Sequence, residues 1–226
     1  HRDLHKEYRR QRQMCIRDSS HVDLEEIEKF TISHYEDNAE SFRVGTKDHD
    51  VSQNIAAFLG ALPKDKKLDI LDFGCGPGRD VNVFKEMGHR PTGLDGSKEF
   101  CKMTQQLSKC PILHQKFLHL ELEDSSFDGI FANASLFHVP SLELPRVLRE
   151  LHCALRKEGI LFSSNPRGNM EGWHGQRYGY YMEFEVSEIY LKQSGFKIID
   201  HYYRPSGKPR EHQPWLAIVS QRQELK

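Results

Sequence analysis

The sequence predicts an α/β domain with a central, mostly parallel sheet and helices on both faces. Short apolar runs alternate with segments whose apolar residues recur every three or four positions, as expected for strands that alternate with helices. The clearest run, Ile70, Leu71 and Phe73, ends in three alternate glycines and precedes an amphipathic segment, which indicates a buried strand, a tight turn and a helix. With 226 residues, the chain is long enough for one sizeable domain and too short for two comfortable ones.

The turn at Gly74, Gly76 and Gly78 is the first candidate binding site. Because glycine lacks a Cβ atom, this turn can take positive φ angles and let a ligand lie against bare backbone. Bare backbone beside a helix N-terminus is a typical small-molecule site. A dinucleotide fingerprint would place its third glycine at position 79, where Arg79 stands, and the Gly-Lys-Ser/Thr ending of a Walker loop is absent.

The segment from Asp72 to Asp80 resembles motif I of the class I S-adenosylmethionine-dependent methyltransferases: an acidic residue, an apolar residue, Gly-x-Gly-x-Gly and a polar pair. The resemblance extends from about Val22 to the end of the chain. It implies a Rossmann-like doubly wound seven-stranded sheet, mostly parallel, with an antiparallel C-terminal strand pair. A glycine-rich turn that holds no ligand is the alternative. The cofactor that the resemblance implies is S-adenosylmethionine, bound at this motif by Asp72, Gly74, Cys75, Gly76, Gly78 and Arg79.

The first residues differ from the rest of the chain. Residues 1–19 are rich in Arg, Lys, Gln and His and lack apolar periodicity, so we expect a disordered or extraneous tail, with a basic nucleic-acid-binding arm as the alternative. Residues 20–226 then form the methyltransferase domain. A helix from about Val22 leads into Tyr35, and a second helix, with its apolar face at 55–62, stops at Pro63. The resemblance places this region over the cofactor and implies a contact from Tyr35; an ordinary solvated loop is the alternative.

A second strand, at 90–94, ends in an acidic residue. In a doubly wound fold, a carboxylate at the tip of the second strand lies beside the ribose of a nucleotide-like ligand, and its two oxygens can accept both hydroxyls. We therefore predict that Asp95, Gly96 and Ser97 bind the cofactor, with helix capping as the alternative role of the acid. Ser97 can also cap the next helix, at 98–107.

The third strand, around 112–117, departs from the family pattern. Many members have an acid here that takes the adenine amino group, whereas this chain has Gln115-Lys116-Phe117. Adenine recognition then passes to the backbone, with Gln115 or Phe117 beside the ring.

The fourth strand, at 126–134, is apolar on both faces and therefore central. Its end, from Asn133 to Pro140, lies at the carboxyl edge of the sheet, where open α/β sheets bind their ligands. The resemblance places methyl transfer here, with Asn133 near the cofactor. It makes His138 the candidate catalytic residue, either orienting the acceptor or acting as a general base. A histidine satisfied at a helix end is the alternative.

The later elements complete the pattern, with helices at 144–155 and 185–193 and strands at 160–164, 196–203 and 215–220. Between them, residues 169–184 form an aromatic- and glycine-rich stretch that we expect to be a variable loop selecting the acceptor, with a lid that folds only for packing as the alternative. The candidate substrate-binding residues are His138, Arg167, Trp173, Tyr178 and Arg210.

Composition limits the partners. The formal net charge of −1 gives no general attraction to nucleic acid or to anionic membranes, so neither is an expected partner. No apolar run approaches the ~20 residues that span a bilayer. The five cysteines are odd in number and form no Cys-x-x-Cys pair, which favours a reducing, cytoplasmic location. Despite 13 histidines, no spacing predicts a metal site, and a monomer and a homodimer fit the sequence equally.

The sequence thus predicts an enzyme that transfers a methyl group from S-adenosylmethionine to an acceptor, expected to be a small molecule, by in-line displacement and mainly by positioning the reactants. A catalytically silent binding module with the same fold is one alternative. An NAD-dependent oxidoreductase is the other, although the glycine spacing and the closing strand pair count against it.

Overall fold

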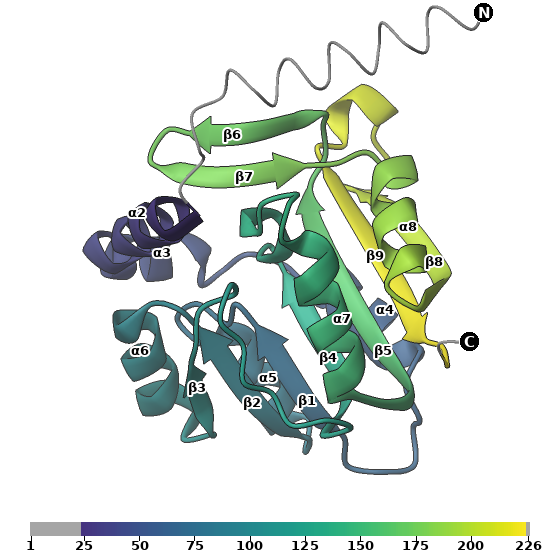
Figure 1. The fold of residues 1–226 in the computed structure, drawn as a ribbon. Helices are drawn as coiled ribbons and strands as arrows, with labels where there is room; N and C mark the ends of the chain where they lie inside the picture. The colour runs from purple at the N-terminus through teal and green to yellow at the C-terminus, as the bar shows by residue number, and fades with distance from the viewer. Residues whose placement is uncertain (1–23, 225–226) are drawn as a thin grey trace, which may run out of the picture.

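The computed structural model describes residues 24–224, so the predicted tail at 1–19 and Val22 lie outside the described residues. Within that range, seven strands form one sheet in the order β3-β2-β1-β4-β5-β9-β8 (Figure 1). The strands are β1 (Asp69–Phe73), β2 (Arg90–Asp95), β3 (Ile112–His114), β4 (Phe127–Asn133), β5 (Leu155–Pro166), β8 (Phe196–Arg204) and β9 (Trp215–Arg222).

The strand directions confirm the predicted fold class. The pairs β1–β2, β1–β4, β2–β3 and β4–β5 are parallel, whereas β9 pairs antiparallel with both β5 and β8. The closing strand β9 therefore lies inside the sheet, between β5 and β8, and β8 forms the edge.

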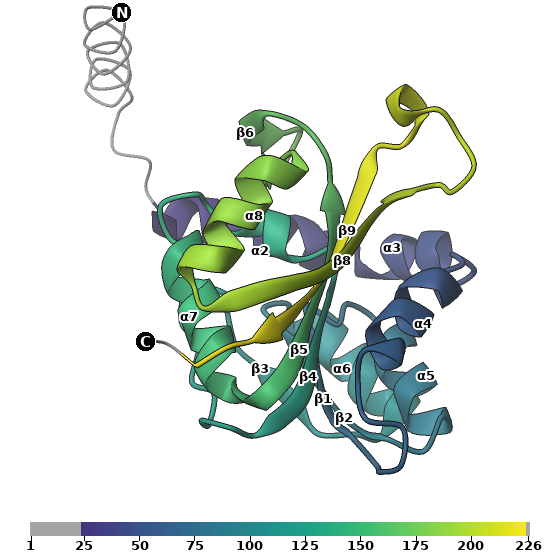
Figure 2. The same cartoon turned by 90° about the vertical axis from the view of Figure 1, so that its right-hand side faces the viewer.

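Helices cover both faces of the sheet (Figure 2). On one face lie α4 (Ser52–Gly60), α5 (Arg79–Glu86) and α6 (Lys98–Ser108), and on the other α7 (Leu144–Ala154) and α8 (Phe184–Gln193). Successive strand residues point to opposite faces, so in β1 Ile70 packs on the α4 side and Leu71 joins the core beneath α7. This is why the strands read as nearly continuous apolar runs.

The carboxyl ends of β1, β2, β4 and β5 meet at one edge, which further elements cover. The helices α2 (Leu24–Asp37) and α3 (Ala39–Thr46) lie beside a separate hairpin, β6 (Met170–His174) and β7 (Arg177–Tyr181), above that edge (Figure 1). The Tyr178 amide donates a hydrogen bond to Thr31 Oγ1 at 3.1 Å, and the rings of Phe30 and Trp173 meet edge to face. Segments more than 140 residues apart in the chain thus form one cover.

Two predicted elements were wrong in their extent. Residues 169–184 are mainly the β6–β7 hairpin rather than an irregular loop, with Gly175 at its turn in the left-handed region. The third strand ends at His114 rather than near Phe117, because the Gln115 side chain bonds both the amide and the carbonyl of Glu121 and closes a turn.

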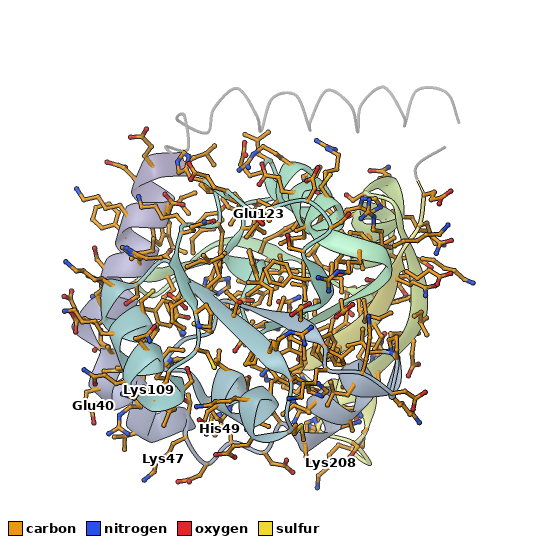
Figure 3. All side chains as sticks on the ribbon, turned by 90° about the horizontal axis from the view of Figure 1, so that it is seen from below. Glu40, Lys47, His49, Lys109, Glu123 and Lys208 are labelled. Carbon is orange, nitrogen blue, oxygen red and sulfur yellow. The ribbon has the colours of Figure 1, made fainter. Side chains whose placement is uncertain are left out.

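The outer surface carries charges of both signs. Glu40, Lys47, Lys109 and Glu123 are exposed at the periphery of the molecule (Figure 3). Among residues 24–224, no helix combines the length and the apolar composition needed to cross a bilayer.

Candidate active site

A cavity of about 590 Å³ lies between the carboxyl edge of the sheet and the cover of α2, α3 and adjoining loops. The structure brings most of the predicted site residues to its wall. These are Tyr35, Gly74, Cys75, Gly76, Arg79, Asp95, Gly96, Ser97, Phe117, Asn133 and His138. The other predicted site residues do not line the cavity; they are Asp72, Gly78, Gln115, Arg167, Trp173, Tyr178 and Arg210.

The three glycines of the turn have different physical roles. All have positive φ, at 79°, 52° and 93° for Gly74, Gly76 and Gly78. A Cβ atom at Gly74 would lie 2.4 Å from Ser135 Cβ, and one at Gly78 would lie 2.8 Å from Thr104, including its backbone. A Cβ atom at Gly76 would meet only the far edge of Phe42, at 3.8 Å. Packing therefore requires glycine at positions 74 and 78. At position 76 the glycine instead leaves its backbone open to the cavity, because it has no side chain.

Asp95 ends β2 beside this turn. Its Oδ2 accepts the Gly76 amide at 2.9 Å and its Oδ1 accepts the Ser97 amide at 2.8 Å. A carboxylate has about four lone-pair sites, so Asp95 can accept from ligand donors as well as from backbone amides. Burial raises the pKa of Asp95 to about 6, against the lowering effect of the Ser97 and Gly76 amides. Hydroxyl donors from a ligand would stabilise the ionised form.

Asp72 lies below the turn and is 2% exposed, behind the cavity wall. Burial raises its pKa well above the ordinary value, and the charges of Asp80 and Asp95 act in the same direction. Its Oδ2 has no hydrogen-bond partner among the described residues. This orphaned oxygen leaves one polar position unfilled directly behind the glycine turn.

The two residues predicted beside the adenine ring differ in whether they line the cavity. Phe117 lines the cavity and stacks on Phe73, with ring centroids 4.3 Å apart. The Gln115 side chain forms hydrogen bonds with both backbone groups of Glu121 and does not line the cavity.

His138 follows β4 in the 3₁₀ turn η1 (Leu136–His138) and is locked by two partners. Its Nδ1 lies 2.6 Å from the Tyr178 carbonyl, which only accepts, so Nδ1 carries the proton. Nε2 is then the acceptor for the Tyr35 hydroxyl at 2.8 Å. Burial lowers the pKa of His138 to about 4, which makes it a weak base. The arrangement orients Tyr35, whose oxygen also accepts a bond from Arg177 at 3.2 Å.

A polar chain that the sequence analysis missed reaches the cavity wall at Asn133 and Asp80. Tyr202 Oη donates to Asn54 Oδ1 at 2.8 Å, and Asn54 Nδ2 donates to Asn133 Oδ1 at 2.9 Å. Asn133 Nδ2 in turn donates to Asp80, which also accepts from Nε and Nη2 of Arg79. Asn54 is fully buried within α4, and a polar residue inside an apolar helical face is the signal that could have found it.

The far wall of the cavity, beyond Asn133, was also missed. It includes Ser164, Trp215 and Arg204, from the ends of β5, β9 and β8. Pro166 pairs with Trp215 and Trp215 with Arg204, so these ends lie side by side on one face. The Ser164 hydroxyl is buried without a hydrogen-bond partner among the described residues, while Arg204 donates to the Asp50 carbonyl at 2.8 Å.

Four predicted substrate residues lie away from the cavity because other groups hold their side chains. Arg167 bonds the carbonyls of Gln213 and Arg210 and pairs with Glu183. Arg210 lies over the Tyr203 ring, and Trp173, which is 48% exposed, packs against Phe30 and Tyr178. Tyr178 acts through its backbone, which binds Thr31 and His138.

Comparisons with known proteins find methyltransferases among the similar proteins. Residues 71–163 match the model of the methyltransferase domain. Malonyl-[acyl-carrier protein] O-methyltransferase of Hamiltonella defensa is 32% identical over 108 residues, which is 47% of this chain and 41% of that protein. Trans-aconitate 2-methyltransferase of an Azoarcus species is 31% identical over 120 residues, or 51% and 46% of the two chains. The match thus spans less than half the length of these relatives.

The fold has a close counterpart among solved structures. The 1,6-didemethyltoxoflavin-N1-methyltransferase of Burkholderia thailandensis, solved with 1,6-didemethyltoxoflavin and S-adenosylhomocysteine, superposes with a TM-score of 0.73 at 22% identity. The superposition covers 92% of this chain and 93% of that one, which establishes the likeness of the folds. The sheet order, the glycine turn and the matched domain model together agree with the predicted resemblance to the class I S-adenosylmethionine-dependent methyltransferases.

Proposed function

We propose that this protein transfers a methyl group from S-adenosylmethionine to a small-molecule acceptor held in the same cavity. The observation that carries the proposal is the pairing of open backbone at Gly76 with the Asp95 carboxylate, both on the cavity wall. Bare backbone at a helix N-terminus accommodates a ligand at close range, and a carboxylate that can accept further hydrogen bonds suits a vicinal diol.

The residues present fit this cofactor. Asp95 would hold the ribose hydroxyls, and Phe117 offers an apolar ring for the base. The turn at Gly74–Gly78 would lie against the amino-acid end, with the orphaned Asp72 oxygen behind it. When bound, the cofactor supplies a methyl group on a sulfonium, which is a good leaving group. The protein's task is therefore to align the acceptor with that methyl group and to exclude water.

Tyr35 and His138 support a positioning role in this reaction. The hydrogen bond from Tyr35 to His138 fixes the phenol at the cavity wall, and the low pKa of His138, about 4, argues against a free general base. We propose that His138 acts through Tyr35, and that no side chain needs to remove a proton from the acceptor during methyl transfer.

The acceptor would occupy the far part of the cavity, by Ser164, Trp215 and Arg204. An indole, an unpaired hydroxyl and a guanidinium together suit a small molecule with a planar portion and polar substituents. The names of the relatives point to varied acceptors, which are malonyl-[acyl-carrier protein], trans-aconitate and 1,6-didemethyltoxoflavin for those three proteins. For this chain we propose a small metabolite. Since the four described cysteines are free thiols, we propose a cytoplasmic location, as a monomer or homodimer.

The test is calorimetric titration of the chain with S-adenosylmethionine, S-adenosylhomocysteine and NAD, followed by measurement of S-adenosylhomocysteine formation across a panel of small acceptors. We expect micromolar or tighter binding of the two sulfur nucleotides, about −8 kcal/mol, with no binding of NAD. Asp95→Ala should lose most of that affinity.

Each rival reading has its own outcome in this test. Binding of NAD in place of the sulfur nucleotides would support an oxidoreductase. Binding of the sulfur nucleotides without turnover on any acceptor would support a catalytically silent module.

A further inference from the structure

One carboxylate on the cavity wall has no part in the site described so far. Glu28 projects from α2 with a side chain only 7% exposed, and it lines the cavity. Its Oε1 accepts the Leu118 amide at 3.3 Å, and its Oε2 lies 3.1 Å from Lys116 Nζ. The bond to Leu118 is long for an amide donor, so it is readily exchanged for a better partner.

The position of Glu28 follows from how α2 meets the end of β2. A Cβ atom at Gly96 would lie 2.8 Å from Ile32 Cδ1, so α2 packs tightly on the turn that carries Asp95. Ile27, Glu28, Ile32, Phe117 and Leu118 all line the cavity on this side. If Asp95 holds the ribose, as proposed above, the base attached to that ribose enters this pocket.

The polar groups of the pocket match one edge of adenine. Glu28 is an acceptor, and the Leu118 amide beside it is a donor. Adenine presents the reverse order, an amino donor beside the ring acceptor N1. Hypoxanthine presents an oxygen acceptor beside an N1–H donor, which would oppose both protein groups. In the absence of a base, Glu28 and Leu118 satisfy each other.

We propose that Glu28, supplied by the N-terminal helix, accepts the adenine amino group of the cofactor, while the Leu118 amide donates to N1. This inference rests on the proposed function. The segment Gln115-Lys116-Phe117 has no carboxylate of its own. Glu28, from another part of the chain, would take the place of that carboxylate, and Lys116 is paired with Glu28. Glu28 is therefore a specificity-determining residue for the base.

The experiment compares binding of S-adenosylhomocysteine with its deaminated analogue, S-inosylhomocysteine, by calorimetry. A site built to hydrogen-bond a group discriminates strongly against an analogue without it. We expect the wild-type chain to bind the inosyl analogue about 100-fold more weakly. In Glu28→Gln the side-chain amide can donate to the exocyclic oxygen of hypoxanthine, so this ratio should fall to about tenfold or less.

Three further variants sharpen the readout. Glu28→Ala should also lower the ratio, whereas Glu25→Ala, at an exposed position of the same helix, should leave it unchanged. Lys116→Met removes the ion pair but keeps the carboxylate, so it should preserve the discrimination. Thermal melting of each variant checks that it is folded.

The outcomes separate the two proposals. Failure of the wild-type chain to bind S-adenosylhomocysteine would overturn the proposed function. Binding of both nucleotides with equal affinity by the wild-type chain would overturn only the role of Glu28. The same holds if Glu28→Gln weakens both nucleotides by the same factor, because a purely structural ion pair predicts that result.

Discussion

The two ends of the cavity are built in different ways. At the cofactor end, the glycine turn and Asp95 come from consecutive segments of the chain, and the backbone amide of Gly76 donates a hydrogen bond to the Asp95 carboxylate. At the acceptor end, Asn133, Ser164, Arg204 and Trp215 come from four separate strands and meet only in the finished fold. A site fixed by backbone tolerates little local change, whereas a site assembled from distant side chains can vary one residue at a time. This difference agrees with the different acceptors that the names of the similar proteins carry.

The largest expected effect separates packing from binding within the glycine turn. Gly78→Ala places a Cβ atom 2.8 Å from the Thr104 backbone at a φ of 93°, and should lower the free energy of unfolding by about 3 kcal/mol. Gly76→Ala meets no close neighbour and should cost only about 1 kcal/mol, yet it should weaken S-adenosylhomocysteine binding at least ~10-fold. Urea unfolding and calorimetry measure the two effects. Equal stability losses in the two variants would refute the division of roles.

The next prediction concerns the polar chain on the acceptor side. Asn54→Leu leaves Asn133 Oδ1 and the Tyr202 hydroxyl without their buried partner, and should lower the free energy of unfolding by about 2 kcal/mol. Its effect on S-adenosylhomocysteine affinity should stay within about threefold, since Asn54 is not on the cavity wall. Asn82→Leu, at a solvent-facing helix position bonded to Glu86, is the control and should change stability by less than ~0.5 kcal/mol. A loss of cofactor binding equal to that of Gly76→Ala would show that the two ends are not separable.

The third prediction uses the titration of Asp95. Its pKa is about 6 without ligand, and ribose donors favour the ionised form, so binding in acid must release a proton. The affinity for S-adenosylhomocysteine should therefore rise with pH up to about 6 and level off above it, with a limiting slope of about tenfold per pH unit below. Calorimetry between pH 5 and pH 7.5 in several buffers checks both the slope and the proton release. Asp95→Asn should abolish the pH dependence of the affinity. A wild-type affinity that does not change with pH would contradict the proposed contact between Asp95 and the ribose.

The smallest expected effect is at His138. Because the pKa of this buried imidazole is about 4, its ionisation should cause no change near pH 6.5 in the pH profile of the rate of S-adenosylhomocysteine formation. His138→Gln can still accept from Tyr35 and donate to the Tyr178 carbonyl, so its rate should fall less than that of His138→Leu, for which about tenfold is expected. Both variants should bind S-adenosylhomocysteine normally. A loss of more than about 1,000-fold in His138→Gln would instead indicate a general base.

Local sequence predicted the features that depend on local structure. The glycine turn, the position of Asp95 and the alternation of strands and helices follow from the backbone needs of neighbouring residues, and the predicted seven-stranded, mostly parallel sheet with antiparallel closing strands is confirmed. The β6–β7 hairpin was not predicted, because Gly172 and Gly179 interrupt both strands and its inner face packs on α2, a helix that no local pattern links to it. Glu28 and Asn54 were missed for the same reason, since their partners lie 90 and 79 residues away.

The interior place of β9 also sets an order of assembly during synthesis. When residues up to about Tyr203 have left the ribosome, the glycine turn, Asp95 and strands β1 to β5 are all available, but β8 has no neighbour to pair with. Only when Trp215–Arg222 emerges can β9 insert between β5 and β8 and bring Trp215 to the cavity. The nascent chain can therefore complete its cofactor end first, and a nucleotide bound there would stabilise the sheet while its last strands are still being made.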